Sequence, residues 1–186
     1  MSWHMLHFSD LQRKPVSDQL FLFADAYLES ADSLCAVLCK NVDAATYAHG
    51  AVIMSLTFHA LELFLKSAIL RKVPTETFAG RAGHDLTNLH KRYTNLYPGN
   101  AMHFAIPFKR ELPDTKELDP QVAEELLAYV CEQNKNMPED QLHRYPISVD
   151  GKEWKAALGF EPNSFRMTIL QLRSELAAVK VRIQGG

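Results

Sequence analysis

The sequence predicts an all-α protein, an up-down bundle of about five helices with a loop or short hairpin inserted before the last helix. Apolar residues recur at steps of three and four along most of the chain, which is typical of amphipathic helices. Prolines are rare up to Tyr97 and frequent from Pro98 to Pro162. The first half therefore favours long uninterrupted helices, and the second half favours helices separated by ordered loops.

The chain has 186 residues, of which 47% are apolar and 23% charged, with a net charge of -2. This length and composition suit one globular domain over residues 1–186, with its core in about residues 17–183. The nearly balanced charge argues against a protein whose main task is to grip duplex nucleic acid. A local basic patch remains compatible with it.

Two long helices are expected first. One runs over residues 17–40, with Ser17 as N-cap and Asp18 in its first turn. Its apolar stripe is Leu20, Ala24, Tyr27, Ala31, Leu34 and Leu38. The second runs over residues 44–72 and is apolar almost all round, which predicts the central, buried helix of the bundle.

The second half is expected to alternate helices with loops. A third helix begins near Asp85 and stops before Pro98, and an ordered loop with one short helix fills residues 98–119. Asp119 as N-cap and Pro120 at the first helical position open a fourth helix, to about residue 136. Its expected inner face consists of Val122, Leu126, Tyr129 and Val130.

A Pro/Gly-rich ordered loop is expected over residues 137–162. Asp150-Gly151 lies between short β-prone runs, which predicts a two-residue hairpin within residues 144–152. The last helix then spans residues 163–183. Its apolar stripe is Phe165, Ile169, Leu172, Leu176 and Val179.

The first and last helices carry more apolar residues than one bundle face needs. The surplus residues are Phe21, Leu22, Leu28, Val37, Leu170 and Val181. Since pairing like helices about a two-fold axis is the commonest way to cover such a surface, we expect a homodimer.

A cytoplasmic protein without metal or cofactor is expected. Three cysteines are too few for a disulfide scaffold and lack zinc-site spacing. Polar residues in Met1–Asp10 interrupt the place of a signal-peptide core. The longest apolar stretches are broken by His59, Glu62 and Lys66, so we expect no membrane span.

The same three polar residues share one face of the second helix, because they lie at steps of three and four. They form a small acid–base or ligand site, or else a same-helix Glu62–Lys66 pair beside a satisfied core histidine. His84 and Asp85 open the next helix, where Asp85 is placed to act as a cap. If both segments converge, His59, Glu62, Lys66, His84 and Asp85 build one polar pocket.

Two segments resemble the HEPN family of small α-helical domains. They are Phe58–Ala68, with the sequence FHALELFLKSA, and Gly83-His84-Asp85-Leu86. Residues 26–31 and Arg144-Tyr145-Pro146 are similar to further segments of the family. The resemblance implies a bundle that commonly dimerises. It also implies a family of metal-independent ribonucleases, toxin and defence components, nucleotidyltransferase partners and inactive binding versions.

The nuclease signature of that family is an Arg followed, after four to six residues, by a His. No Arg in this sequence meets that spacing. We therefore expect a non-catalytic binding or regulatory module. The alternatives are a divergent metal-independent ribonuclease and a subunit that folds against a nucleotidyltransferase or another protein. Arg144 and Tyr145 are the residues expected to contact RNA or a phosphate, or else to pin their loop to the bundle.

Overall fold

The computed structural model describes residues 5–108, 115–136 and 159–185. In this part of the chain the regular structure is helical, which confirms the all-α class. A short helix, α1 (Ser9–Gln12), precedes five long ones. The long helices are α2 (Val16–Leu38), α3 (Tyr47–Lys72), α4 (Leu86–Leu96), α5 (Pro120–Asn136) and α7 (Pro162–Gly185). The hairpin predicted within residues 144–152 lies outside the described residues.

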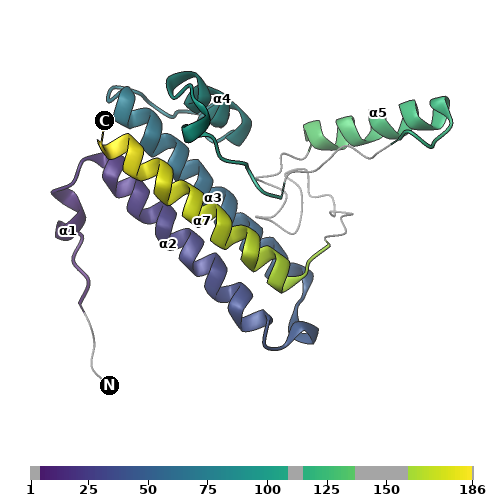
Figure 1. Cartoon of the computed structure of the whole chain (residues 1–186), viewed down its shortest axis with the longest axis horizontal. Coiled ribbons are helices and arrows are strands. Elements are labelled where there is room, and N and C mark those ends of the chain that lie inside the picture. Colours follow the sequence, from purple (N-terminus) through teal and green to yellow (C-terminus); the bar gives the residue numbers. More distant parts are fainter. Residues whose placement is uncertain (1–4, 109–114, 137–158, 186) are drawn as a thin grey trace.

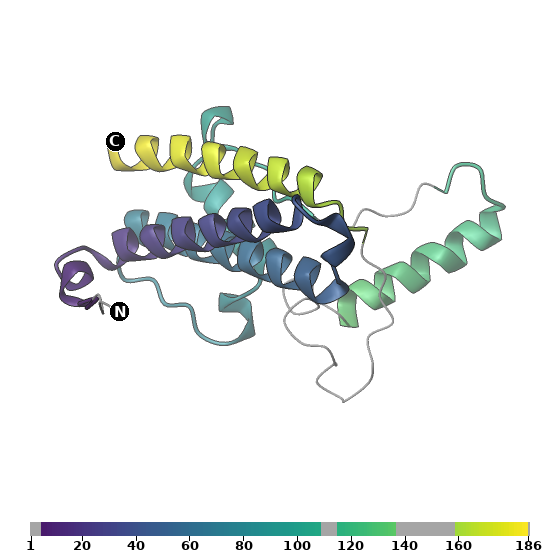
Figure 2. The same ribbon diagram turned by 90° about the horizontal axis from the view of Figure 1, so that it is seen from below.

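An antiparallel pair of helices, α2 and α3, forms the centre of the fold (Figure 1). Helix α7 covers one side of this pair, and α4 packs against α3 (Figures 1 and 2). The core lies where α2, α3 and α7 meet, with Phe21, Phe64 and Ile169 among its buried side chains. The opposite side of the α2–α3 pair carries no α7.

Helix α3 is the buried central helix that the sequence predicts, and it ends at Lys72 as expected. It begins at Tyr47 rather than near Ala44, because residues 42–44 form a 3₁₀ turn and the Thr46 side chain caps the helix. By length and composition α3 is apolar enough to cross a membrane, but 72% of its apolar 18-residue stretch is buried inside the bundle. The apolar residues of α3 are thus mostly buried in the core of the bundle.

The predicted N-cap of the first helix is wrong. Helix α2 starts one residue earlier, at Val16, with Pro15 at the cap position and no side-chain cap bond. Ser17 is buried, and its carbonyl accepts a hydrogen bond from the Ser67 hydroxyl of α3. Tertiary packing therefore determines this terminus, because the bond ties the start of α2 to the end of α3.

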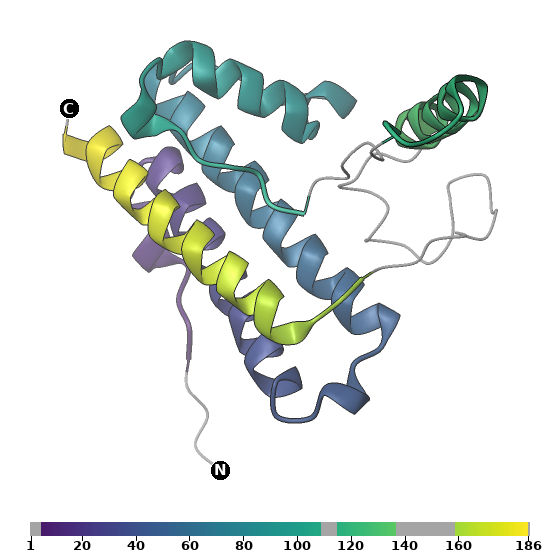
Figure 3. The ribbon, with the colours of Figure 1, turned by 45° about the vertical axis from the view of Figure 1, so that its right-hand side comes forward.

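Helix α5 stands apart from the other long helices (Figures 1 and 3). Its N-terminus follows the prediction, since the Gln121 amide donates to the Asp119 carboxylate at 2.9 Å. Its predicted inner face is wrong at Val122 and Tyr129, which are 51% and 61% exposed. Spacing reveals an amphipathic helix, but it does not reveal which element covers the apolar side.

The predicted dimer surface also needs correction. Phe21 and Leu28 are each only 2% exposed and belong to the core of the single chain. The other four residues, Leu22, Val37, Leu170 and Val181, are exposed. Ion pairs cross the outer seam between α2 and α7, so this side of the molecule is charged. They join Arg166 to Asp32 at 2.8 Å, and Arg173 to Asp25 at 3.0 Å and to Glu29 at 3.4 Å.

Candidate functional site

A buried carboxylate organises the polar face of α3. Glu62 has a side chain only 2% exposed, and its Oε1 atom accepts a hydrogen bond from Lys66 Nζ at 2.7 Å. His59, one turn earlier, places Nδ1 3.8 Å from the other carboxylate oxygen. These positions follow from the helix itself, because residues three and four apart lie on one face.

His84 reaches the same carboxylate from the loop before α4. Its Nδ1 atom lies 2.8 Å from Glu62 Oε1. The structure thus brings His59, Glu62, Lys66 and His84 together, and we call these four residues the polar cluster. The contact between Glu62 and His84 joins α3 to the start of α4 across 22 residues of sequence.

The charge state of Glu62 follows from these contacts. Burial by itself raises the pKa of the Glu62 carboxyl, because the charged form loses water. Interactions with His59, Lys66 and His84 outweigh burial and lower this pKa to about 2. Glu62 is therefore ionised at neutral pH, and His84 must donate its Nδ1 proton to it. This hydrogen bond through Nδ1 leaves the Nε2 atom of His84 as the other ring nitrogen, available for a different partner.

A tight loop positions His84. The backbone of Gly83 approaches Phe78 so closely that a Cβ atom at residue 83 would lie 2.6 Å from the Phe78 carbonyl carbon. The Gly83 amide also donates to the Gly80 carbonyl at 3.1 Å. Only glycine fits at position 83 without displacing the chain that carries Phe78.

Asp85 has a structural role. Its carboxylate accepts hydrogen bonds from the backbone amides of Thr87 at 2.8 Å and Asn88 at 3.1 Å. These bonds satisfy two otherwise free amides at the start of α4, as an N-cap does. The cap prediction is confirmed, and the contacts of Asp85 lie with α4 rather than with the polar cluster.

Two neighbours of the polar cluster escape sequence reasoning. The Phe78 ring lies 5.3 Å from Lys66 Nζ and 5.6 Å from the Arg92 guanidinium carbon. Arg92 in turn pairs with Glu76 at 2.6 Å. Phe78 stands in a loop without periodicity, so its place beside Lys66 had no sequence signal. Arg92 stands in α4, but helical periodicity does not show which loop its long side chain contacts.

Outside the polar cluster, the described residues form no further cluster of side chains suited to chemistry. Among these residues, no three His, Cys, Asp or Glu side chains lie close enough together to hold a metal ion. Arg144 and Tyr145, the predicted phosphate or RNA contacts, lie outside the described residues.

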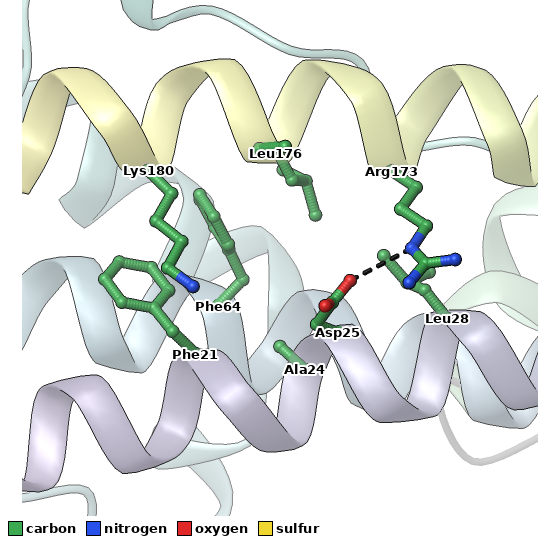
Figure 4. Close-up of a pocket in the computed structure, with 9 residues that line it drawn as sticks. Phe21, Ala24, Asp25, Leu28, Phe64, Arg173, Leu176 and Lys180 are labelled. Carbon is green, nitrogen blue, oxygen red and sulfur yellow. Dashed lines mark hydrogen bonds and ion pairs between the residues drawn. The ribbon is translucent and has the colours of Figure 1, made fainter.

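A small pocket of about 80 Å³ lies away from the polar cluster, between α2, α3 and α7 (Figure 4). Phe21, Leu28 and Phe64 contribute to its apolar lining. Arg173 and Lys180 of α7 lie at its rim, where Arg173 pairs with Asp25 and the Lys180 ammonium lies 5.5 Å from the Phe21 ring. Its cations are thus engaged across the α2–α7 seam, and we interpret the pocket as an imperfection of core packing.

The geometry gives the polar cluster two chemical capacities. It can lock α3 to α4 through a shared carboxylate, or it can present a carboxylate-oriented imidazole, since the His84 side chain is 53% exposed. Searches of protein-family models, curated proteins and solved structures found no match to this chain.

Proposed function

We propose that this chain is a non-catalytic, HEPN-like binding or regulatory module that works in the cytoplasm, in a nucleic-acid-related or defence context. The observation that carries the proposal is the pairing of buried Glu62 with Lys66 at 2.7 Å. A cleavage site needs a cation free to stabilise developing negative charge. Lys66 has a side chain 9% exposed and is held by Glu62, so its charge is committed to the fold.

The nearby arginine supports the same interpretation. Arg92 pairs with Glu76 at 2.6 Å and also lies over the Phe78 ring. Lys66 within the polar cluster and Arg92 beside it therefore each have a carboxylate partner. The polar cluster holds α3, the loop carrying Phe78 and the start of α4 in one arrangement. A ligand would therefore bind to other surfaces of the bundle.

The second function to consider is metal-independent RNA cleavage. It is favoured by the half-exposed His84 imidazole, whose Nδ1 is oriented by Glu62 at 2.8 Å. A histidine held by a carboxylate in this way has the tautomer needed for proton transfer at Nε2. This function would still require a cation from another part of the chain or from a second subunit.

A cleavage assay separates the two functions. Purified protein is incubated with labelled single-stranded RNA in EDTA, together with the variants His84→Ala and His103→Ala. His103 is an exposed histidine outside the polar cluster and serves as the matched control. We expect no cleavage by the wild type. Cleavage that His84→Ala abolishes and His103→Ala retains would establish the nuclease instead.

A third possibility, a subunit that folds against a nucleotidyltransferase-type or other protein partner, draws support from exposed apolar side chains. Phe23 of α2 and Val52 of α3 are 44% and 48% exposed. Such residues favour a protein rather than a nucleic acid as the ligand, because apolar surface binds apolar surface. We retain both the homodimer and a protein partner as proposals, with RNA as the weaker ligand.

A further inference from the structure

A cavity of about 310 Å³ lies at the end of the bundle where α2 begins and α3 ends (Figures 1 and 2). We call it the Ser17 cavity. Most of its lining is apolar, and the lining residues are Pro15, Val16, Ser17, Leu70, Arg71 and Pro74. Small-molecule sites begin at about 300 Å³ and combine an apolar wall with a few polar groups. The Ser17 cavity has both features.

The first turn of α2 brings free backbone amides to this cavity. Pro15 stands at the cap position, and no side chain caps the helix. The Pro15 carbonyl accepts from the amides of Asp18 at 2.9 Å and Gln19 at 3.1 Å. The amides of Val16 and Ser17 have no acceptor among the residues that the structure describes. Free amides at the positive end of a helix dipole favour an anion.

A buried hydroxyl in the same turn also lacks a partner. Ser17 lines the cavity and is only 6% exposed. Its carbonyl accepts a hydrogen bond from the Ser67 hydroxyl, but the Ser17 hydroxyl itself makes no hydrogen bond within the described part of the chain. A hydroxyl that is buried without a hydrogen bond costs stability. The Ser17 hydroxyl therefore calls for a partner that enters through the cavity.

Arg71 adds a cation to the lining. Its Nη1 atom lies 3.6 Å from the Asp18 carboxylate, which is longer than a hydrogen bond, and its side chain is 37% exposed. The guanidinium therefore has donors left for a second acceptor. Asp18 has a further partner of its own, because Gln184 of α7 donates to its Oδ1 atom at 3.2 Å. Exposed Lys14 and Lys72 flank the lining residues in sequence and add positive charge to this end of the bundle.

We propose that the Ser17 cavity binds a small aliphatic monocarboxylate. The carboxylate accepts hydrogen bonds from the Ser17 hydroxyl, the free amides of the first turn and Arg71. The alkyl group lies against Leu70 and the two prolines of the lining. This proposal goes beyond the proposed function, since no residue of the cavity belongs to the polar cluster.

The size and charge of the cavity select this class of ligand. At about 30 Å³ for each water-sized unit, the cavity has room for on the order of ten non-hydrogen atoms. Asp18 beside Arg71 repels a dianion more strongly than a monoanion. The apolar wall offers no hydrogen bonds to a ligand that is polar all round, such as inorganic phosphate. A single charge on a short alkyl chain satisfies all three conditions.

An NMR titration of the full chain with sodium hexanoate tests the proposal. Hexanoate should shift the backbone amide resonances of Val16 and Ser17. It should bind about tenfold or more tightly than acetate, which lacks the alkyl chain, and than hexan-1-ol, which lacks the charge. Inorganic phosphate should bind no better than acetate.

Two variants test the polar contacts independently. Arg71→Gln removes the cation and Ser17→Ala removes the hydroxyl, and each should weaken hexanoate binding about fivefold or more. Arg166→Gln breaks the ion pair with Asp32, farther along α2, and is the matched control that should bind hexanoate as the wild type does. Without hexanoate, Ser17→Ala should melt no lower than the wild type, because the hydroxyl makes no hydrogen bond to lose.

Three results would overturn the proposal. They are the absence of amide shifts at Val16 and Ser17 up to tens of millimolar hexanoate, equal binding of hexanoate and acetate, and unchanged binding by both Arg71→Gln and Ser17→Ala. A lower melting temperature of Ser17→Ala would also overturn it, because the hydroxyl would then have a partner within the fold. Circular dichroism checks that each variant folds. These results are independent of the RNA cleavage assay.

Discussion

The Nδ1 atom of His84 lies 2.8 Å from the Glu62 carboxylate, which also accepts a hydrogen bond from Lys66 at 2.7 Å. This arrangement joins the central helix to the start of α4 through one ionised, buried group. Because a buried charge is tolerated only with partners, the residues around Glu62 depend on one another.

Stability should fall in acid. The pKa of Glu62 is lowered from 4.5 in the unfolded chain to about 2 in the fold. The stabilisation is present above pH 4.5 and is lost as pH falls toward 2, since the unfolded chain then binds a proton more readily than the folded one. We expect a loss on the order of 3 kcal/mol in the free energy of unfolding. Urea denaturation from pH 6 to pH 2 measures this loss. If the free energy of unfolding of Glu62→Gln falls with pH as steeply as that of the wild type, other groups cause the effect.

Gly83→Ala should disturb the polar cluster. The new methyl group would meet the Phe78 carbonyl carbon at 2.6 Å, so the loop must shift and carry His84 with it. We expect a destabilisation of about 1–3 kcal/mol, together with changed NMR chemical shifts of the His84 imidazole. Gly159→Ala is the matched control, because nothing lies within 4 Å of a Cβ atom there. Equal effects of the two substitutions would refute the role of the close approach.

Asp85 should behave as a cap and not as a member of the polar cluster. Asp85→Ala removes the acceptor for the Thr87 and Asn88 amides and should cost about 1 kcal/mol of stability. Asp85→Asn keeps an acceptor oxygen and should cost a few tenths of a kcal/mol. Thermal melts of both variants check this difference. An Asn variant as unstable as the Ala variant would show that the charge of Asp85 matters beyond capping.

Much of the fold is readable from the sequence, because helical periodicity and caps are local. Asp85 and Asp119 cap the helices that they were expected to cap, and α3 is the buried helix that its all-round apolar surface predicts. What escaped prediction depends on contacts between distant segments. The burial of Phe21 and Leu28 where α2, α3 and α7 meet, the exposure of Tyr129 and the contact of Phe78 with Lys66 are of this kind.

The polar cluster was only partly predictable for the same reason. Helical spacing alone puts His59, Glu62 and Lys66 on one face, so their proximity follows from local geometry. His84 reaches Glu62 because the loop before α4 folds back toward α3. The sequence sign of this loop is Gly83, and the close approach of Gly83 to Phe78 is seen only in three dimensions.

The polar cluster joins α3 to the start of α4, and the stability of Glu62→Gln tests this structural role most directly. In that variant Lys66 stays buried without its carboxylate, so we expect a loss on the order of 3–5 kcal/mol at pH 7, measured by urea denaturation. Adding Lys66→Met to Glu62→Gln removes the stranded charge and should restore much of that loss. Glu76→Gln, which breaks the more exposed pair with Arg92, is the control and should cost less than about 1 kcal/mol. A Glu62→Gln protein as stable as the wild type would contradict the account.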